Sequence, residues 1–219
     1  MNSEIPTYVI NCKHLHERRK NVETQFTNQG FSNYTFFIEY DVSDLAKMPF
    51  EETQKLYQPN SVQFTNKVKA GGWKDWWNHN PRVLRDAEIS LTAKFGYLFK
   101  EIGSGNHEVS IIFEDDIILC DNFIEKFNEY YAQLPDDWDV CYMGSGANLK
   151  PDQIENGKLV YKKSHPSSRC ADSILIKREA ARKIGKTYFP FHLCSDWEIG
   201  YQQAHHNMNV YWWEPALVK

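Results

Sequence analysis

The sequence predicts an α/β protein with a mainly parallel central sheet flanked by helices. Short apolar runs typical of buried strands alternate along the chain with longer segments of helical periodicity. The chain also opens with a strand–helix–strand pattern, which is the unit that builds parallel sheets. No repeat, low-complexity tract or linker interrupts the 219 residues, so we expect a single domain over residues 1–219.

The opening unit consists of two apolar strands, at residues 7–11 and 34–40, on either side of a helix. The helix is indicated by a partial apolar stripe at Leu15, Val22 and Phe26. Gly30 follows the last residue of the stripe and provides the helix stop. Residues 41–82 carry scattered Pro and Gly and show no clear pattern.

Strands and helices continue to alternate in the rest of the chain. A helix is predicted from Arg85, with Asp86 as candidate N-cap, up to the GSGN sequence at 103–106. A strand at 108–113 follows, and then a helix capped by Asp121. The remaining predicted elements are a strand at 138–144, an edge or hairpin strand at 157–163, a strand at 171–176, a short helix at 177–185 closed by Gly185, a helix at 195–206 and a strand at 207–215.

Composition excludes some classes of function. Hydrophobic residues make up 42% and aromatic residues 15% of the chain, which is enough for a packed core. The formal net charge of -4 argues against a nucleic-acid partner, because such binding depends on neutralising phosphates. Five Cys without CxxC spacing indicate reduced thiols. With no signal-peptide pattern and no membrane-spanning run, we expect a cytoplasmic protein, with peripheral membrane contact left open.

The most informative stretch is IIFEDDIIL, in which three acids separate two apolar triplets. Ligands of open α/β sheets bind beyond the carboxyl ends of strands, and Glu114 stands at such an end. In extended chain, Glu114 and Asp116 face one side and Asp115 the other. Two carboxylates on one side suit a hard divalent cation such as Mg²⁺ or Mn²⁺.

Three other interpretations stay open at this level. The triplet can simply end a strand and precede the helix that begins near Asp121. A cation site would also serve a metal-dependent phosphoesterase, although such enzymes normally need several separated acids and this chain has one dense cluster. The seven Trp of the chain would also suit a non-catalytic carbohydrate-binding or nucleotide-binding module.

The motif IIFEDDI resembles the metal motif of glycosyltransferase family 25, which includes lipooligosaccharide-biosynthesis and procollagen galactosyltransferases. Other segments are similar to this family in the same order, so the resemblance spans nearly the whole chain. They are TYVINCKHLHERR, AEISLTAKFGYLFKEI, WDVCYMGS, ADSILIKREAARKI, CSDWEIGYQ and VYWWEPALV. The resemblance implies the A-type glycosyltransferase fold with a Rossmann-like nucleotide-binding half. The chain departs from the family at Asp172, where an aromatic residue is common, and at Lys94, which lies near the usual position of a Ser-His pair.

The resemblance implies a nucleotide-sugar donor, with a UDP-sugar the commonest for this fold. It assigns Asp116 to a Mn²⁺ or Mg²⁺ ion that bridges the donor diphosphate. Glu114 is expected to share the metal or to meet the ribose, and Asp115 to take either role. Three further residues are expected on the donor side, namely Asn11, Arg18 and Lys94. For Arg18 and Lys94, a solvent-exposed helix position is the alternative.

The reaction implied is transfer of a hexose, such as galactose or glucose, to a glycan or protein acceptor with inversion. Inversion requires a general base, and the candidates are Asp196 and Glu198. Ser195 and Glu198 fit a capping box, which favours Asp196 as the base. The helix start is expected to lower the pKa of Asp196. Trp197 and the Trp-rich segment 71–80, represented by Trp76, are expected on the acceptor side.

Overall fold

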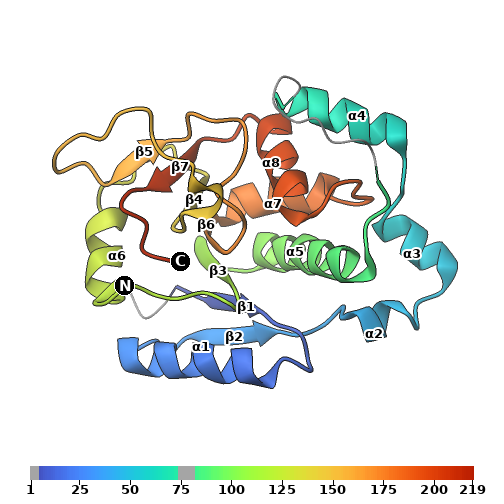
Figure 1. The fold of residues 1–219 in the computed structure, drawn as a ribbon, viewed down its shortest axis with the longest axis horizontal. Coiled ribbons are helices and arrows are strands. Elements are labelled where there is room, and N and C mark those ends of the chain that lie inside the picture. Colours follow the sequence, from blue (N-terminus) through green and yellow to red (C-terminus); the bar gives the residue numbers. More distant parts are fainter. Residues whose placement is uncertain (1–4, 74–81) are drawn as a thin grey trace.

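The computed structural model describes residues 5–73 and 82–219, and its strands form one mixed sheet (Figure 1). The strand order is β2-β1-β3-β6-β4-β7-β5. In these residues β1, β2, β3, β4 and β7 run in one direction, while β5 and β6 run against it. The mainly parallel sheet is therefore confirmed. The strands are β1 (Thr7–Ile10), β2 (Tyr34–Phe37), β3 (Val109–Glu114), β4 (Val140–Tyr142), β5 (Val160–Lys162), β6 (Ser173–Lys177) and β7 (Val210–Trp213).

Helices cover both faces of this sheet. They are α1 (His16–Gln29), α2 (Val42–Leu45), α3 (Phe50–Leu56), α4 (Ser61–Ala70), α5 (Asp86–Ser104), α6 (Phe123–Tyr131), α7 (Arg178–Thr187) and α8 (Ser195–His205), with a 3-10 turn, η1 (Gly146–Asn148). The helices α1 and α6 pack on one face, and α5, α7 and α8 pack on the other. The result is a three-layer α/β/α arrangement, as the alternation of patterns predicts.

Alternate strand residues supply the two cores. In β3, Ile111 and Phe113 pack with Phe26 of α1 and Phe123 of α6. The intervening Ile112 packs on the opposite face, in the cluster that includes α5 and α7. This is why β3 carries the apolar run Ile111–Phe113 directly before Glu114: a strand between two helical layers has no solvent-facing side.

Two glycines predicted to end helices behave differently. Gly30 follows α1 with φ of 77°, the left-handed conformation that glycine adopts without strain, so this stop is confirmed. The prediction that Gly185 closes a helix is wrong, because α7 continues through it to Thr187. A Cβ atom at Gly185 would lie 3.1 Å from the backbone nitrogen of Lys100, so glycine at this position allows α5 and α7 to approach closely.

The apolar triplet after the acids does not continue as a strand. Ile117 and Leu119 are buried, whereas Ile118 is 60% exposed. The segment instead pairs briefly with the end of the chain: Ile118 and Lys219 exchange backbone hydrogen bonds of 2.6 and 2.9 Å. Glu114 thus ends β3, and Asp115 and Asp116 occupy a turn between this strand end and the short bridge.

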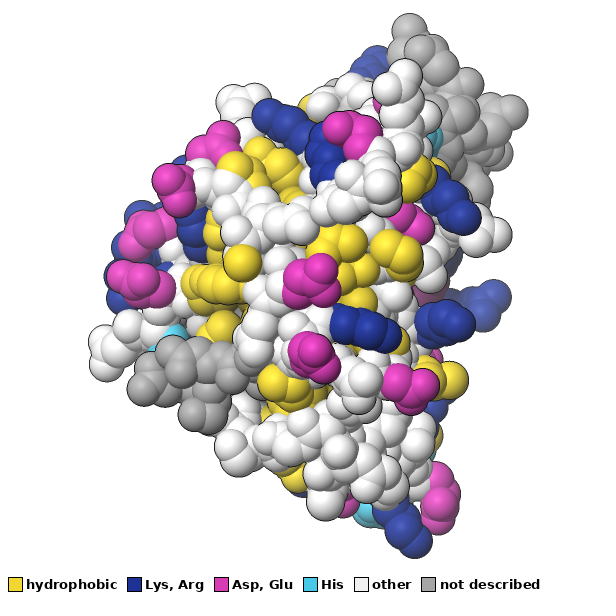
Figure 2. All heavy atoms as spheres, turned by 90° about the vertical axis from the view of Figure 1, so that its left-hand side faces the viewer, with side chains coloured by type: hydrophobic (Ala, Val, Ile, Leu, Met, Phe, Trp, Pro, Cys, Tyr) yellow, Lys and Arg dark blue, Asp and Glu magenta, His cyan; other side chains and the backbone are white. Residues whose placement is uncertain are grey.

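The region that gave no clear pattern forms three short helices, α2 to α4, beside the main layers (Figure 1). Its last helix docks on α8 through a small apolar cluster that contains Phe64, Trp73 and Leu193. On the side of the molecule that carries α6 and β5, Figure 2 shows Lys and Arg interspersed with Asp and Glu rather than gathered into one basic surface.

Candidate active site

The carboxyl ends of β1 and β3 meet at one edge of the sheet. These strands are parallel neighbours, with Ile10 opposite Glu114. The residues that follow them therefore lie side by side, and the Asn11 side-chain amide donates a 2.7 Å hydrogen bond to Asp115 Oδ2. Both residues are buried, with exposed fractions of 2% and 6%. Asp115 is thereby fixed to the first strand.

Arg18 of α1 binds the acidic triplet directly. One guanidinium nitrogen lies 2.8 Å from Asp115 Oδ1 and 3.0 Å from Asp116 Oδ2. The side chain remains 48% exposed, so it stays accessible while it offsets two negative charges. Arg18 thus occupies an exposed helix position, as the alternative expected, and it also contacts two of the acids.

Lys94 is buried and fully occupied within the protein. Its ammonium donates to the backbone oxygens of Asn11, at 3.0 Å, and Glu39, at 2.8 Å. It also pairs with Asp41 Oδ1 at 2.7 Å. The alternative of an exposed helix lysine is wrong, and because these three acceptors use the three N–H groups, none remains for a phosphate in this arrangement. Lys94 instead ties the end of β1 to the segment after β2.

A pocket of about 210 Å³ opens at this edge. It is lined by Ile10, Asn11, Leu15, Leu91 and Glu114, among others. Apolar side chains form one part of the wall, and the amide and carboxylates form the other. Such a combination is typical of sites that hold a planar organic group through its faces and its polar edge.

Four carboxylates lie close enough at this strand end to perturb one another. Burial first, and then the charges of Asp196, Asp116 and Asp172, raise the pKa of Glu114 to about 8. Burial, with the charges of Asp196 and Asp116, raises the pKa of Asp172 to about 6. The expected alternation, with Asp115 facing away from Glu114 and Asp116, is wrong. Asp115 and Asp116 lie in a turn rather than in extended chain, and one Arg18 nitrogen contacts both of them. Asp115 also lines the pocket together with Glu114.

Asp172 was not identified as a functional residue from the sequence. It directly precedes β6, and its backbone oxygen accepts a 2.8 Å hydrogen bond from the N–H of Glu114. Ser173 Oγ donates to its carboxylate at 2.7 Å, and a Cβ atom at Gly144 would clash with the same carboxylate. The only available signal was the departure from the family at this position; the antiparallel pairing of β3 and β6 that places it here was not predictable.

Asp196 lies in the first turn of α8 and faces the same group of acids. Its carboxylate accepts hydrogen bonds from the Ala171 N–H and the Cys170 thiol. The prediction that the helix start lowers its pKa is wrong, because burial outweighs these bonds and raises it. Burial and the neighbouring acids raise the pKa of Cys170 to about 12, so the thiol keeps the proton that it donates.

Glu198 is completely buried and belongs to a different network. Its Oε1 accepts a 2.6 Å bond from Lys67, and its Oε2 accepts from the N–H groups of His192, at 3.2 Å, and Leu193, at 3.3 Å. The predicted capping box is wrong, since Cys194 is the N-cap residue and no side chain caps the helix. Glu198 still reaches backward, but to the loop before the helix, and this network gives it a structural role.

The aromatic residues expected on the acceptor side are only partly described. Trp197 packs edge-on against Trp73 with ring centroids 4.9 Å apart. It borders the small apolar cluster between α4 and α8. Trp76 and most of the Trp-rich segment lie outside the described residues.

The oxygen donors at the strand end fit a shared cation better than an enclosed one. Within residues 5–73 and 82–219, no group of three or more His, Cys, Asp and Glu is arranged to hold a metal on its own. Asp116 is 51% exposed. Burial first, and then the other acids, raise the pKa of Glu114 to about 8, so this carboxyl group is protonated at neutral pH in the absence of a cation. Hard oxygens in small number are the donor set of Mg²⁺ and Mn²⁺ ions that complete their shell with substrate phosphates.

A pocket at the carboxyl ends of parallel strands, bordered by carboxylates, defines an α/β enzyme that binds its ligand at this edge of the sheet. Residues 4–196 match the family described as Glycosyltransferase family 25 (LPS biosynthesis protein). The chain belongs to this family and is a glycosyltransferase. The resemblance to glycosyltransferase family 25 stated from the motif IIFEDDI is therefore confirmed.

Other comparisons are more distant. No curated protein matches the chain. Among solved structures, mouse xyloside xylosyltransferase 1 in its apo form is similar, with 12% sequence identity and a TM-score of 0.40; the match covers 94% of this chain and 83% of that one. In the part of the chain that the structure describes, no helix combines the length and apolar character needed to cross a bilayer.

Proposed function

We propose that the enzyme transfers a hexose, such as galactose or glucose, from a nucleotide diphosphate sugar to a hydroxyl group of a glycan or protein acceptor. The observation that carries the proposal is the gathering of Glu114, Asp116, Asp172 and Asp196 beside the pocket at the ends of β1 and β3. A UDP-sugar is the proposed donor, held by Asn11, Arg18 and the acidic triplet.

The donor side of the proposal rests on two features. The pocket has an apolar wall for a base or ribose, together with buried polar groups at Asn11 and Asp115. Arg18 is half-exposed beside the acids, where its guanidinium can pair with a phosphate as well as with carboxylates. Lys94 supports this wall from behind rather than contacting phosphate.

Asp116 and Glu114 are the proposed ligands of a Mn²⁺ or Mg²⁺ ion shared with the diphosphate. When bound, the cation supplies electrostatic stabilisation of the departing nucleoside diphosphate. The mutual repulsion of the four carboxylates supports this assignment, because a divalent cation would relieve it. The same repulsion would favour binding at higher pH, where Glu114 has lost its proton.

Asp196 is the proposed general base of an inverting transfer. Its carboxylate takes the proton of the acceptor hydroxyl while that oxygen forms a bond to the anomeric carbon of the donor. The bond from this carbon to the phosphate oxygen breaks, and its electron pair leaves with the nucleoside diphosphate. The raised pKa of Asp196 makes it a stronger base than an exposed aspartate, so the corrected sign of its shift supports the role.

A donor screen tests the proposal. Calorimetry with a panel of nucleotide sugars and Mn²⁺ should reveal cation-dependent binding, and transfer should follow with a suitable glycan or peptide. Asp196→Asn should retain nucleotide binding and lose transfer, whereas the exposed Asp121→Asn serves as a control that keeps both. Inversion is checked by the anomeric configuration of the product in NMR spectra. Absence of cation-dependent binding for every nucleotide tested would refute the donor assignment.

A further inference from the structure

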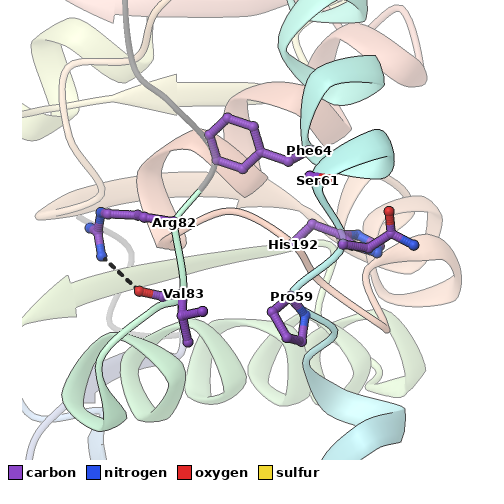
Figure 3. A pocket seen from close by; sticks show the side chains of 7 residues that line it. Pro59, Ser61, Phe64, Arg82, Val83 and His192 are labelled. Carbon is purple, nitrogen blue, oxygen red and sulfur yellow. Dashed lines mark hydrogen bonds between the residues drawn. The ribbon is translucent and has the colours of Figure 1, made fainter.

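A second pocket, of about 110 Å³, lies away from the strand ends (Figure 3). Three segments that are distant in the sequence form it. The turn before α4 and the start of that helix contribute Pro59, Asn60, Ser61 and Phe64. Arg82 and Val83 come from the segment before α5, and His192 comes from the loop before α8. No residue assigned to the donor or to the cation lines this pocket.

The walls of this second pocket are held by hydrogen bonds that do not involve its lining side chains. Phe191 N–H donates to Leu56 O at 2.8 Å, and Gln58 N–H donates to Phe191 O at 3.2 Å, so the loop before α8 is fastened to the end of α3. The Tyr57 hydroxyl accepts a 2.8 Å bond from Leu84 N–H, which fixes the segment that carries Val83. The pocket is therefore a preorganised feature of the fold.

His192 is the exceptional residue of this pocket. Its side chain is 7% exposed, and neither ring nitrogen has a hydrogen-bond partner among residues 5–73 and 82–219. Its backbone N–H donates to Glu198 Oε2 at 3.2 Å. Burial first, and then the charge of Lys67, lower the pKa of His192 to about 4. The ring is thus neutral at neutral pH and offers one N–H donor and one acceptor nitrogen.

The charges around the pocket are already paired. Arg82 forms a two-point ion pair with Glu88, with distances of 2.7 and 2.5 Å. Lys67 pairs with Glu198 at 2.6 Å. A neutral ligand is therefore favoured over an anion. A hydroxyl group both accepts and donates, which matches a neutral imidazole, and the C–H face of a sugar ring suits a wall made of Pro59 and Val83.

The second pocket shares the loop before α8 with the proposed base. His192 lies in this loop four residues before Asp196, and Cys194 between them is the N-cap residue of α8. We propose that this pocket binds a sugar ring of the acceptor and that His192 hydrogen-bonds one of its hydroxyl groups. The inference rests on the proposed function, and it gives the acceptor a chemical class, that of a carbohydrate.

Binding to the pocket can be tested without the donor. The probes are the methyl glycosides of glucose and galactose, added to the whole protein while the ring resonances of His192 are followed by NMR. We expect one of them to shift these resonances. His192→Ala should then weaken binding about tenfold, the loss expected for a buried hydrogen bond, and His192→Gln should retain most of it. The exposed His107→Ala is the matched control.

Kinetics separates an acceptor role from a structural one. In a transfer assay, His192→Ala should raise the KM for a glycan acceptor and leave donor KM and acceptor-independent donor hydrolysis unchanged. If that variant fails to fold, Ser61→Tyr, at an exposed position on the rim, should obstruct the pocket and have the same effect. Two results would overturn the proposal: no shift of the His192 resonances with any glycoside, or unchanged binding in both variants. If the unsubstituted protein showed no cation-dependent binding of any nucleotide, that result would instead refute the proposed function.

Discussion

The substitution Glu114→Gln should remove the loss of stability with rising pH that Glu114 causes at the strand end. In the native protein without a cation, burial and the neighbouring acids hold the pKa of Glu114 at about 8 instead of 4.5. The folded protein therefore retains a proton that the unfolded chain releases above about pH 4.5. This contribution to stability is fully present at low pH and is lost as pH rises to about 8. Gln resembles the protonated carboxyl group in shape and does not titrate.

The magnitude follows from the size of the pKa shift. Where the native state binds one more proton than the unfolded state, the free energy of unfolding falls by about 1.4 kcal/mol for each pH unit. Between pH 5.5 and 7.5, Glu114 should therefore cost the native enzyme roughly 2.7 kcal/mol that the Gln variant does not lose. For a chain of this length, that corresponds to a difference in Tm of about 5 to 11 °C.

The assay is denaturant unfolding at a series of pH values with a chelator present, so that no cation competes with the proton. The quantity to compare is the change in unfolding free energy with pH in the native enzyme and in Glu114→Gln. Glu125→Gln, at an exposed position on α6, is the matched control and should follow the native profile. Asp172, whose pKa is raised to about 6 chiefly by burial, titrates in both proteins, so its own contribution is present on both sides of the comparison.

Parallel pH profiles for the native enzyme and Glu114→Gln would refute the reasoning. Such a result would mean that Glu114 is ionised at neutral pH despite its burial, and that the four carboxylates do not repel one another in solution. A smaller but clear divergence would still identify Glu114 as the group that titrates, because the sign of the difference is set by the direction of the pKa shift.

Three further substitutions test other contacts of the site and its frame. Asp116→Ala should remove Mn²⁺-dependent nucleotide binding in calorimetry while the circular dichroism spectrum persists, since this side chain is 51% exposed; undiminished binding would contradict its role as a ligand. Lys67→Met should lower the free energy of unfolding by about 3 kcal/mol, because it leaves a buried carboxylate without its cation. The exposed Lys69→Met on the same helix is the control, and equal stabilities of the two variants would argue against the buried pair. Gly144→Ala should displace the Asp172 carboxylate and reduce transfer activity, with a loss of stability of about 1 to 3 kcal/mol. Full activity of a folded Gly144→Ala protein would show that the position of this carboxylate is unimportant.

Local patterns in the sequence were sufficient for most of the fold. The apolar runs that became β1, β3 and β7 are buried on both faces, so a continuous hydrophobic stretch was a reliable signal. The errors came where distant segments decide the structure. Gly185 continues a helix because α5 packs against it, and residues 117–119 bridge to the end of the chain. Neither contact has a signal in the local sequence.

The candidate site also has some features that the local sequence predicted and others that depend on distant segments. The position of the acidic triplet was predictable, because a strand and its end are adjacent in sequence. The side chains that contact the triplet were less predictable from the sequence. Arg18 and Lys94 looked alike as cations on helices, yet Arg18 is half-exposed beside the acids and Lys94 is buried behind the pocket. Asp172 reaches the site only through the antiparallel pairing of β3 and β6, which strand patterns alone do not specify.

The loop before α8 explains why two acids two residues apart have different roles. Asp196 faces Glu114 and Asp172, whereas Glu198 turns toward Lys67 and the backbone of His192. The structural acid therefore holds the same loop from which the proposed base and the second pocket extend. A buried ion pair contributes little net stability, but it fixes the geometry of the groups that bond to it. Lys67→Met should consequently disturb acceptor binding more than donor binding, even though neither residue of the pair contacts a substrate in the proposed scheme.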